Sequence, residues 1–78
     1  MKVIFRKFKD EIIAFFPDTY QNGEMICYAH IGQHSTTDII FYKKTKRAKE
    51  NEYLPLLNEL ETVIGYKNLE VKARMQYK

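Results

Sequence analysis

The most reactive side chains of this 78-residue chain lie between Met25 and Asp38. This stretch contains the only cysteine, Cys27, and both histidines, His30 and His34. Their Cys-x2-His-x3-His spacing is similar to part of a zinc site, because zinc prefers thiolate and imidazole ligands. An extended strand places Cys27 and His30 on opposite faces, however, and a structural zinc site normally has four ligands. Metal binding through these three residues is therefore a minor alternative, and we expect no cofactor.

Nucleophilic catalysis would need Cys27 or Ser35 to be exposed and within hydrogen-bond reach of a histidine base. Cys27 is expected in the middle of a strand on an apolar face, where a thiol is inert and behaves as a small hydrophobic group. No Gly-x-Ser-x-Gly turn surrounds Ser35. We therefore expect no enzymatic activity.

Polar side chains at the end of this predicted strand form a candidate binding site instead. They would be exposed on a rigid scaffold, where binding residues are common. The candidates are His30, Gln33, His34, Ser35 and Asp38. The six tyrosines and the free edges of a small sheet favour a protein partner or self-association. We expect a small binding or regulatory module that acts through protein–protein interaction.

Positive charge is the second chemical signal. No lysine or arginine occurs from Asp10 to Tyr42, although the chain has 13 of them against 10 acidic residues. Five cations then follow almost together: Lys43, Lys44, Lys46, Arg47 and Lys49. They lead into the start of a predicted helix, where phosphate binding is favourable. Nucleic-acid binding through residues 43–49 is the alternative function, and a solvated loop is the simpler interpretation because no recognised nucleic-acid motif is present.

Hydrophobic patterning predicts the scaffold, a single α+β domain over residues 1–78. Its first elements are expected to be four antiparallel strands, over residues 3–8, 11–16, 24–31 and 38–45. The second strand has apolar residues at both odd and even positions, so both of its faces should be covered. Pro17 should end that strand because proline lacks the donor that a ladder needs, and Asn22-Gly23 is the strongest turn signal.

One amphipathic helix is expected next, followed by a last strand. Apolar residues recur at spacings of three and four: Tyr53, Leu56, Leu57, Leu60, Val63 and Ile64. Pro55 puts the helix start near residues 51–53, and Gly65 supplies a left-handed stop. A last strand with one buried face is indicated by alternating Leu69, Val71, Ala73 and Met75. The expected fold is a four-stranded antiparallel meander, one helix packed on one sheet face and a last strand (β-β-β-β-α-β).

The hydropathy of the chain predicts neither a membrane span nor a signal peptide. No apolar run approaches the roughly 18 residues that a membrane span requires, and the first residues lack an apolar run of signal-peptide length. We expect no membrane association and a cytoplasmic location.

Four segments resemble a family of short uncharacterised bacterial proteins from gut-type bacteria and their mobile elements. They are residues 1–10, 13–17, 28–35 and 64–66, and His-x-Gly-Gln-His at residues 30–34 is the most distinctive. The resemblance spans most of the chain and implies a soluble intracellular protein, with no known activity, substrate or catalytic residue.

The chain departs from this family in two places. Its first turn, Lys9-Asp10, leads directly to Glu11 without a glycine. Residues 46–49 read Lys-Arg-Ala-Lys where the family pattern suggests Arg-Pro-Ala-Thr. The second departure makes the basic run particular to this chain.

Overall fold

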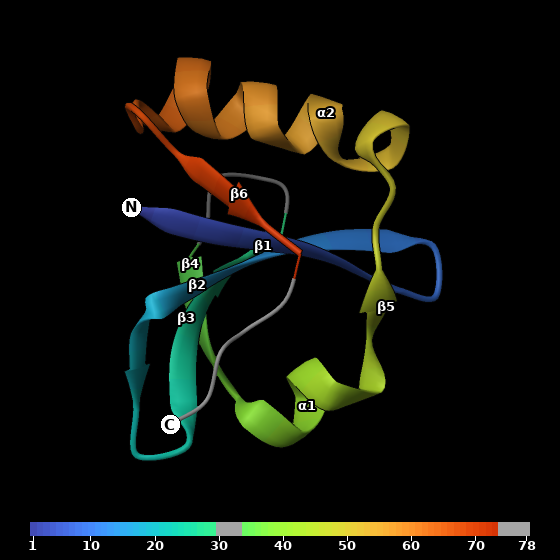
Figure 1. Ribbon diagram of the computed structural model, residues 1–78, viewed down its shortest axis with the longest axis vertical. Coiled ribbons are helices and arrows are strands. Elements are labelled where there is room, and N and C mark those ends of the chain that lie inside the picture. Colours follow the sequence, from blue (N-terminus) through green and yellow to red (C-terminus); the bar gives the residue numbers. More distant parts are fainter. Residues whose placement is uncertain (30–33, 74–78) are drawn as a thin grey trace.

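The computed structural model describes residues 1–29 and 34–73, which form an α+β fold with a mixed sheet and helices on both of its faces (Figure 1). The elements are β1 (Lys2–Phe8), β2 (Glu11–Gln21), β3 (Glu24–Tyr28), β4 (His34–Asp38), α1 (Ile39–Lys44), β5 (Lys46–Arg47), α2 (Glu50–Glu59), the π-helical turn η1 (Leu60–Ile64) and β6 (Glu70–Lys72). The strand order is β4-β3-β2-β1-β5, and these neighbours are antiparallel. β6 pairs in parallel with the start of β1, on the same side as β5.

The sheet has a hydrophobic cluster on each face because the central strands have apolar residues at both odd and even positions. On one face, the buried cluster lies between the sheet and the helical segment formed by α2 and η1. Its members are Val3, Phe5, Ala14, Phe16, Tyr28, Ala48, Leu56 and Leu60. On the other face, the buried residues beside α1 are Ile4, Ile13, Phe15, Met25, Cys27 and Tyr42. The prediction that β2 is covered on both faces is therefore confirmed, whereas the prediction of a single helix on one face is wrong.

The predicted fourth strand over residues 38–45 is wrong. The strand ends at Asp38, and residues 39–44 form α1. Asp38 is the helix N-cap, and its Oδ1 accepts a hydrogen bond from the Phe41 N–H at 2.8 Å. The Tyr42 ring is buried against Phe15, edge to face, with centroids 5.2 Å apart. Burial of these rings outweighs the strand preference of residues 39–42, because packing overrides a weak intrinsic propensity.

The prediction that Pro17 ends the second strand is also wrong, because β2 continues to Gln21. The register between β2 and β3 shifts after Phe16, and proline is tolerated at such an irregularity. Thr19 bridges the shift: its hydroxyl donates to the Phe16 carbonyl at 2.6 Å and accepts from the Ile26 N–H at 2.8 Å.

The hairpin turns agree with the sequence. Lys9 adopts a φ of 57°, and Asn22 and Gly23 adopt 54° and 81°, the left-handed values that tight hairpin turns need. β3 stops at Tyr28, so it is shorter than the predicted strand over residues 24–31.

The predicted helix is present as α2 and η1, with two corrections. It begins at Glu50, so Pro55 lies inside the helix on its exposed side. Leu60 is fully buried as predicted, but Val63 is 72% exposed. The chain widens into η1 at this point, which rotates Val63 away from the apolar stripe. Gly65 ends the helix with a φ of 96°, as expected.

The last strand is shorter than predicted and its buried face is wrong. β6 covers three residues, and Val71 and Ala73 are both exposed. Met75 lies outside the described residues. In the described part of the chain, no helix is both long enough and apolar enough to cross a membrane.

Candidate functional site

The predicted binding stretch ends in the outermost strand of the sheet. Three of its candidate residues, His34, Ser35 and Asp38, lie on β4, and all three are exposed. The other two, His30 and Gln33, lie outside the described residues. Among residues 1–29 and 34–73, β4 pairs with β3 alone. Its outer edge therefore has no neighbouring strand in this part of the chain.

His34 lies on the α2 side of the sheet among aromatic rings. Its ring centroid is 5.1 Å from that of Tyr28, 6.0 Å from Phe16 and 5.9 Å from Tyr66. Its Nε2 is 2.9 Å from the Tyr66 hydroxyl oxygen. The Tyr28 hydroxyl in turn donates to the carboxylate of Glu59 on α2. The imidazole thus connects the edge strand to the segment that follows η1.

Ser35 and Asp38 have other surroundings. Ser35 Oγ is 3.3 Å from Cys27 Sγ, which belongs to the cluster on the α1 side. Asp38 caps α1 through Oδ1. Successive strand residues point to opposite faces, so Ser35 lies on the face opposite His34 and Asp38. His34 and Asp38 lie at the two ends of β4, so the three side chains do not converge on one pocket.

The alternation of side chains along β3 and β4 separates Cys27 from His34, two residues of the metal and catalytic alternatives. Cys27 and His34 lie on opposite faces of the sheet, so the two do not ligate one ion. In the described ranges, no group of three or more His, Cys, Asp or Glu side chains is placed to hold a metal ion. Within the described ranges no histidine lies beside the Cys27–Ser35 pair, since His34 faces the other way. His30 lies outside the described residues.

The backbone of β4 presents polar groups to its outer side. Ile26, the β3 residue opposite Thr36, donates its N–H to Thr19 of β2. In an antiparallel ladder the N–H and C=O of one residue point to the same neighbour, so Ile26 and Thr36 form a non-hydrogen-bonded pair. The N–H and C=O of Thr36 therefore point away from β3, toward the open edge.

The five cations predicted for nucleic-acid binding are divided among three elements. Lys43 and Lys44 form the last turn of α1, where positive charge complements the helix dipole. Lys46 and Arg47 constitute β5, and Lys49 is the N-cap of α2. Of the five, Arg47 and Lys49 line the hollow described next.

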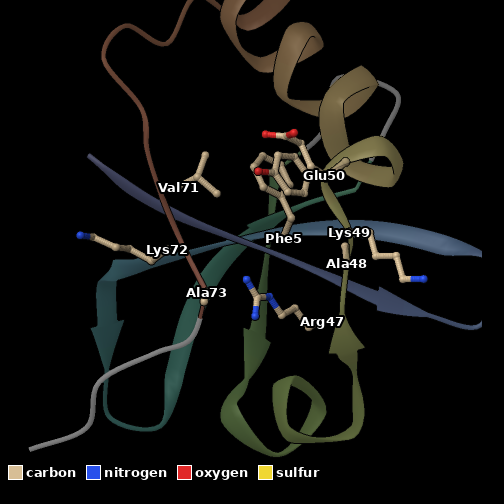
Figure 2. A pocket seen from close by; sticks show the side chains of 9 residues that line it. Phe5, Arg47, Ala48, Lys49, Glu50, Val71, Lys72 and Ala73 are labelled. Atoms are coloured by element: carbon tan, nitrogen blue, oxygen red, sulfur yellow. The ribbon is translucent and has the colours of Figure 1, made fainter.

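A hollow of about 780 Å³ lies where β5, the start of α2 and β6 meet (Figure 2). On its α2 side Phe5 stacks on Tyr53, with ring centroids 4.5 Å apart. Figure 2 shows the Arg47 guanidinium below the β1 ribbon, directed toward the β6 side of the hollow. The ammonium groups of Lys49 and Lys72 point outward on opposite sides. The hollow therefore combines an aromatic wall with three cationic side chains, Arg47, Lys49 and Lys72, and one carboxylate, that of Glu50.

Two ion pairs lie close to this hollow. Lys7 Nζ is 2.7 Å from Glu52 Oε2, and this hydrogen bond raises the pKa of Lys7 and lowers the pKa of Glu52. The Lys49 N–H donates to the other Glu52 oxygen at 2.9 Å and lowers that pKa further. Lys72 Nζ is 2.6 Å from Glu70 Oε1, and this hydrogen bond lowers the pKa of Glu70.

Several residues of these surfaces were missed from the sequence. Arg6 and Lys72 join the hollow's surroundings because β1 pairs with β5 and β6. β5 has no hydrophobic pattern, and the alternating pattern around β6 does not say which strand it pairs with. Tyr66 is not among the candidate residues named from the sequence, although its hydroxyl reaches His34 of β4. A single sequence contains no signal for these long-range pairings.

Comparisons with protein-family models, with curated proteins and with solved structures find no match to this chain. The resemblance to short bacterial proteins with a His-x-Gly-Gln-His segment therefore stays a prediction.

Proposed function

We propose that this chain is a non-catalytic protein-binding module that accepts a partner strand at the outer edge of β4, and that a second copy of the chain is the partner that fits this edge. The main support is the outward direction of the Thr36 N–H and C=O. Backbone groups directed outward from the edge of a sheet are a template for strand addition.

The composition of β4 adds to this argument. Natural edge strands are often protected by proline, lysine or a bulge, which hinder pairing with another chain. The sequence of β4, His-Ser-Thr-Thr-Asp, contains neither proline nor lysine, and its five pairs with β3 run without a register shift. The edge is therefore suited to an added strand.

The side chains of β4 are complementary to a second copy in antiparallel orientation. With Thr36 on a two-fold axis, Thr36 meets its own copy, Ser35 meets Thr37, and His34 meets Asp38. Hydroxyl pairs are cross-strand pairs that stabilise antiparallel strands, and an imidazole N–H can donate a hydrogen bond to a carboxylate. Asp38 uses Oδ1 for the helix cap, which leaves Oδ2 for His34 of the second copy.

The absence of catalysis and the cytoplasmic location belong to the same proposal. Cys27 is 6% exposed, and its hydroxyl neighbour Ser35 lies on the face opposite His34, an arrangement that does not favour nucleophilic chemistry. A buried free thiol is compatible with a reducing compartment.

The experiment measures molecular mass by sedimentation equilibrium over a range of concentrations. Thr36→Pro removes the outward N–H, and the fold should persist because proline is tolerated where the missing donor faces solvent. Thr36→Val, the control, keeps the backbone donor. We expect the wild type and Thr36→Val to reach the mass of a dimer, and Thr36→Pro to remain a single chain with an unchanged circular dichroism spectrum.

Two results would contradict the proposal. A wild-type mass of one chain at the highest concentration excludes the second copy as partner. A folded Thr36→Pro variant that dimerises as the wild type does excludes β4 as the interface.

A further inference from the structure

We propose that Arg6 and Arg47 together bind a phosphate group at the side of the hollow between β5 and β6. This site lies across the sheet from β4, beyond β1, and does not depend on the proposed strand addition. The ligand class is a phosphate group that is free or terminal: inorganic phosphate, or the terminal phosphate of a nucleotide or of a single-stranded nucleic acid.

Arg6 and Arg47 are directly opposite one another in the antiparallel pairing of β1 with β5. Opposed residues project from the same face of a sheet, so the two arginine side chains leave the sheet next to one another. Like charges in this arrangement destabilise the pairing unless a counter-charge is present.

The partners of Arg6 are neutral. Its Nε donates to Thr45 Oγ1 at 2.9 Å, its Nη2 donates to the Thr45 carbonyl oxygen, and its guanidinium lies 4.9 Å from the centre of the Tyr42 ring. These contacts fix the guanidinium in position without neutralising it. No carboxylate of residues 1–29 or 34–73 forms a salt bridge with Arg6 or Arg47.

The neighbouring pair of the same two strands shows the contrast. Lys7 and Lys46 are also directly opposed, on the other face of the sheet. There, Glu52 of α2 reaches Lys7 at 2.7 Å and supplies the counter-charge. One of two adjacent like-charge pairs thus has an acidic partner from within the described chain, whereas the arginine pair lacks one.

Lys72 extends the positive charge on the arginine side. It is opposite Ile4 in β6, and Ile4 and Arg6 project from the same face because they are two residues apart in β1. Lys72 is paired with Glu70, so the uncompensated charge lies on the two arginines.

Guanidinium groups suit a phosphate because their planar N–H groups can donate in pairs to phosphate oxygens. The adjoining hollow of about 780 Å³ falls within the usual size of a small-molecule site. This site also narrows the nucleic-acid alternative to Arg47 and Lys49, the two members of segment 43–49 that line the hollow.

The experiment titrates the full chain at low salt, by calorimetry, with inorganic phosphate, adenosine monophosphate, and a short oligothymidylate with and without a 5′-phosphate. Arg47→Gln removes one guanidinium from an exposed position. Lys44→Gln is the matched control, since it removes the same charge from α1, away from the hollow. Circular dichroism establishes that both variants are folded.

We expect saturable binding of a phosphate-containing probe, weakened about tenfold or more by Arg47→Gln and within about twofold of the wild type in Lys44→Gln, with affinity falling as salt rises. Equal affinity for phosphate and the nucleotide identifies the phosphate group alone as the ligand. Tighter binding of the nucleotide, or of the 5′-phosphorylated oligomer, identifies the larger ligand. Absence of saturable binding by the wild type, or equal weakening by the two substitutions, overturns the inference.

Discussion

His34 and Tyr66 join the edge of the sheet to the segment that follows the helix. Nε2 of His34 is 2.9 Å from the Tyr66 hydroxyl oxygen, and the Tyr66 ring stacks on Phe16 with centroids 5.3 Å apart. The first residue of the proposed binding strand is thus held by a contact from the far end of the described chain. Its position depends on Tyr66.

Tyr66→Phe removes this hydroxyl and keeps the ring. We expect the free energy of unfolding to fall by about 0.5–1 kcal/mol, the lower part of the usual range, because His34 is exposed and water can replace the lost partner. Urea denaturation measures the change. Tyr20→Phe is the control, since Tyr20 is 40% exposed. Equal stability of both variants would show that the His34–Tyr66 contact contributes nothing measurable.

The parts of the fold that the sequence predicted correctly are those with local signals. The turns at Lys9 and Asn22, the apolar face of Cys27, and the stop at Gly65 each follow from a residue type or an alternation within a few positions. They need no knowledge of distant partners.

The sequence-based predictions are wrong where contacts between distant parts of the chain determine the structure. Residues 39–42 have strand propensity, yet Asp38 caps a helix there because the sheet face beneath needs a cover. β6 was expected to bury one face, but it pairs at the border of the sheet, where Val71 is 38% exposed. The candidate residues of β4 were correctly expected to be exposed, whereas the arginine pair required the β1–β5 register, which no local pattern contains.

Asp38→Ala tests the helix cap that overturned the predicted strand. Loss of an N-cap acceptor typically costs about 1 kcal/mol, and we expect a loss of that size in the free energy of unfolding. Asp38→Asn retains an oxygen acceptor and should stay within a few tenths of a kcal/mol of the wild type. Chemical denaturation of the three proteins side by side is the measurement. Equal losses in both variants would mean that the charge of Asp38, rather than its acceptor, stabilises α1.

The Lys7–Glu52 pair predicts a dependence of stability on pH. The pKa of Glu52 is lowered from its ordinary value of 4.5, so its contribution is present above that value and is lost as the pH falls through the lower pKa of the folded state. The pKa of Lys7 is raised from 10.5, so its contribution is complete below that value and is lost as the pH rises through the raised pKa.

Glu52→Gln should therefore flatten the acid limb of the stability curve, measured as the midpoint of thermal unfolding between neutral and acidic pH. Glu50→Gln is the matched control because Glu50 is an exposed acid in the same helical turn. An acid limb that is identical in the wild type and Glu52→Gln would contradict the role assigned to the pair.

Leu60→Ala and Val63→Ala distinguish the observed helix register from the one that the sequence predicts. Leu60 is fully buried against the sheet, and truncation of such a residue costs about 2–5 kcal/mol. Val63 is 72% exposed, so its truncation should change the free energy of unfolding by less than about 0.5 kcal/mol. Both values come from urea denaturation. A regular helix would instead place Val63 on the buried stripe with Leu60, and a loss above about 1 kcal/mol in Val63→Ala would then favour that register over the π-helical turn.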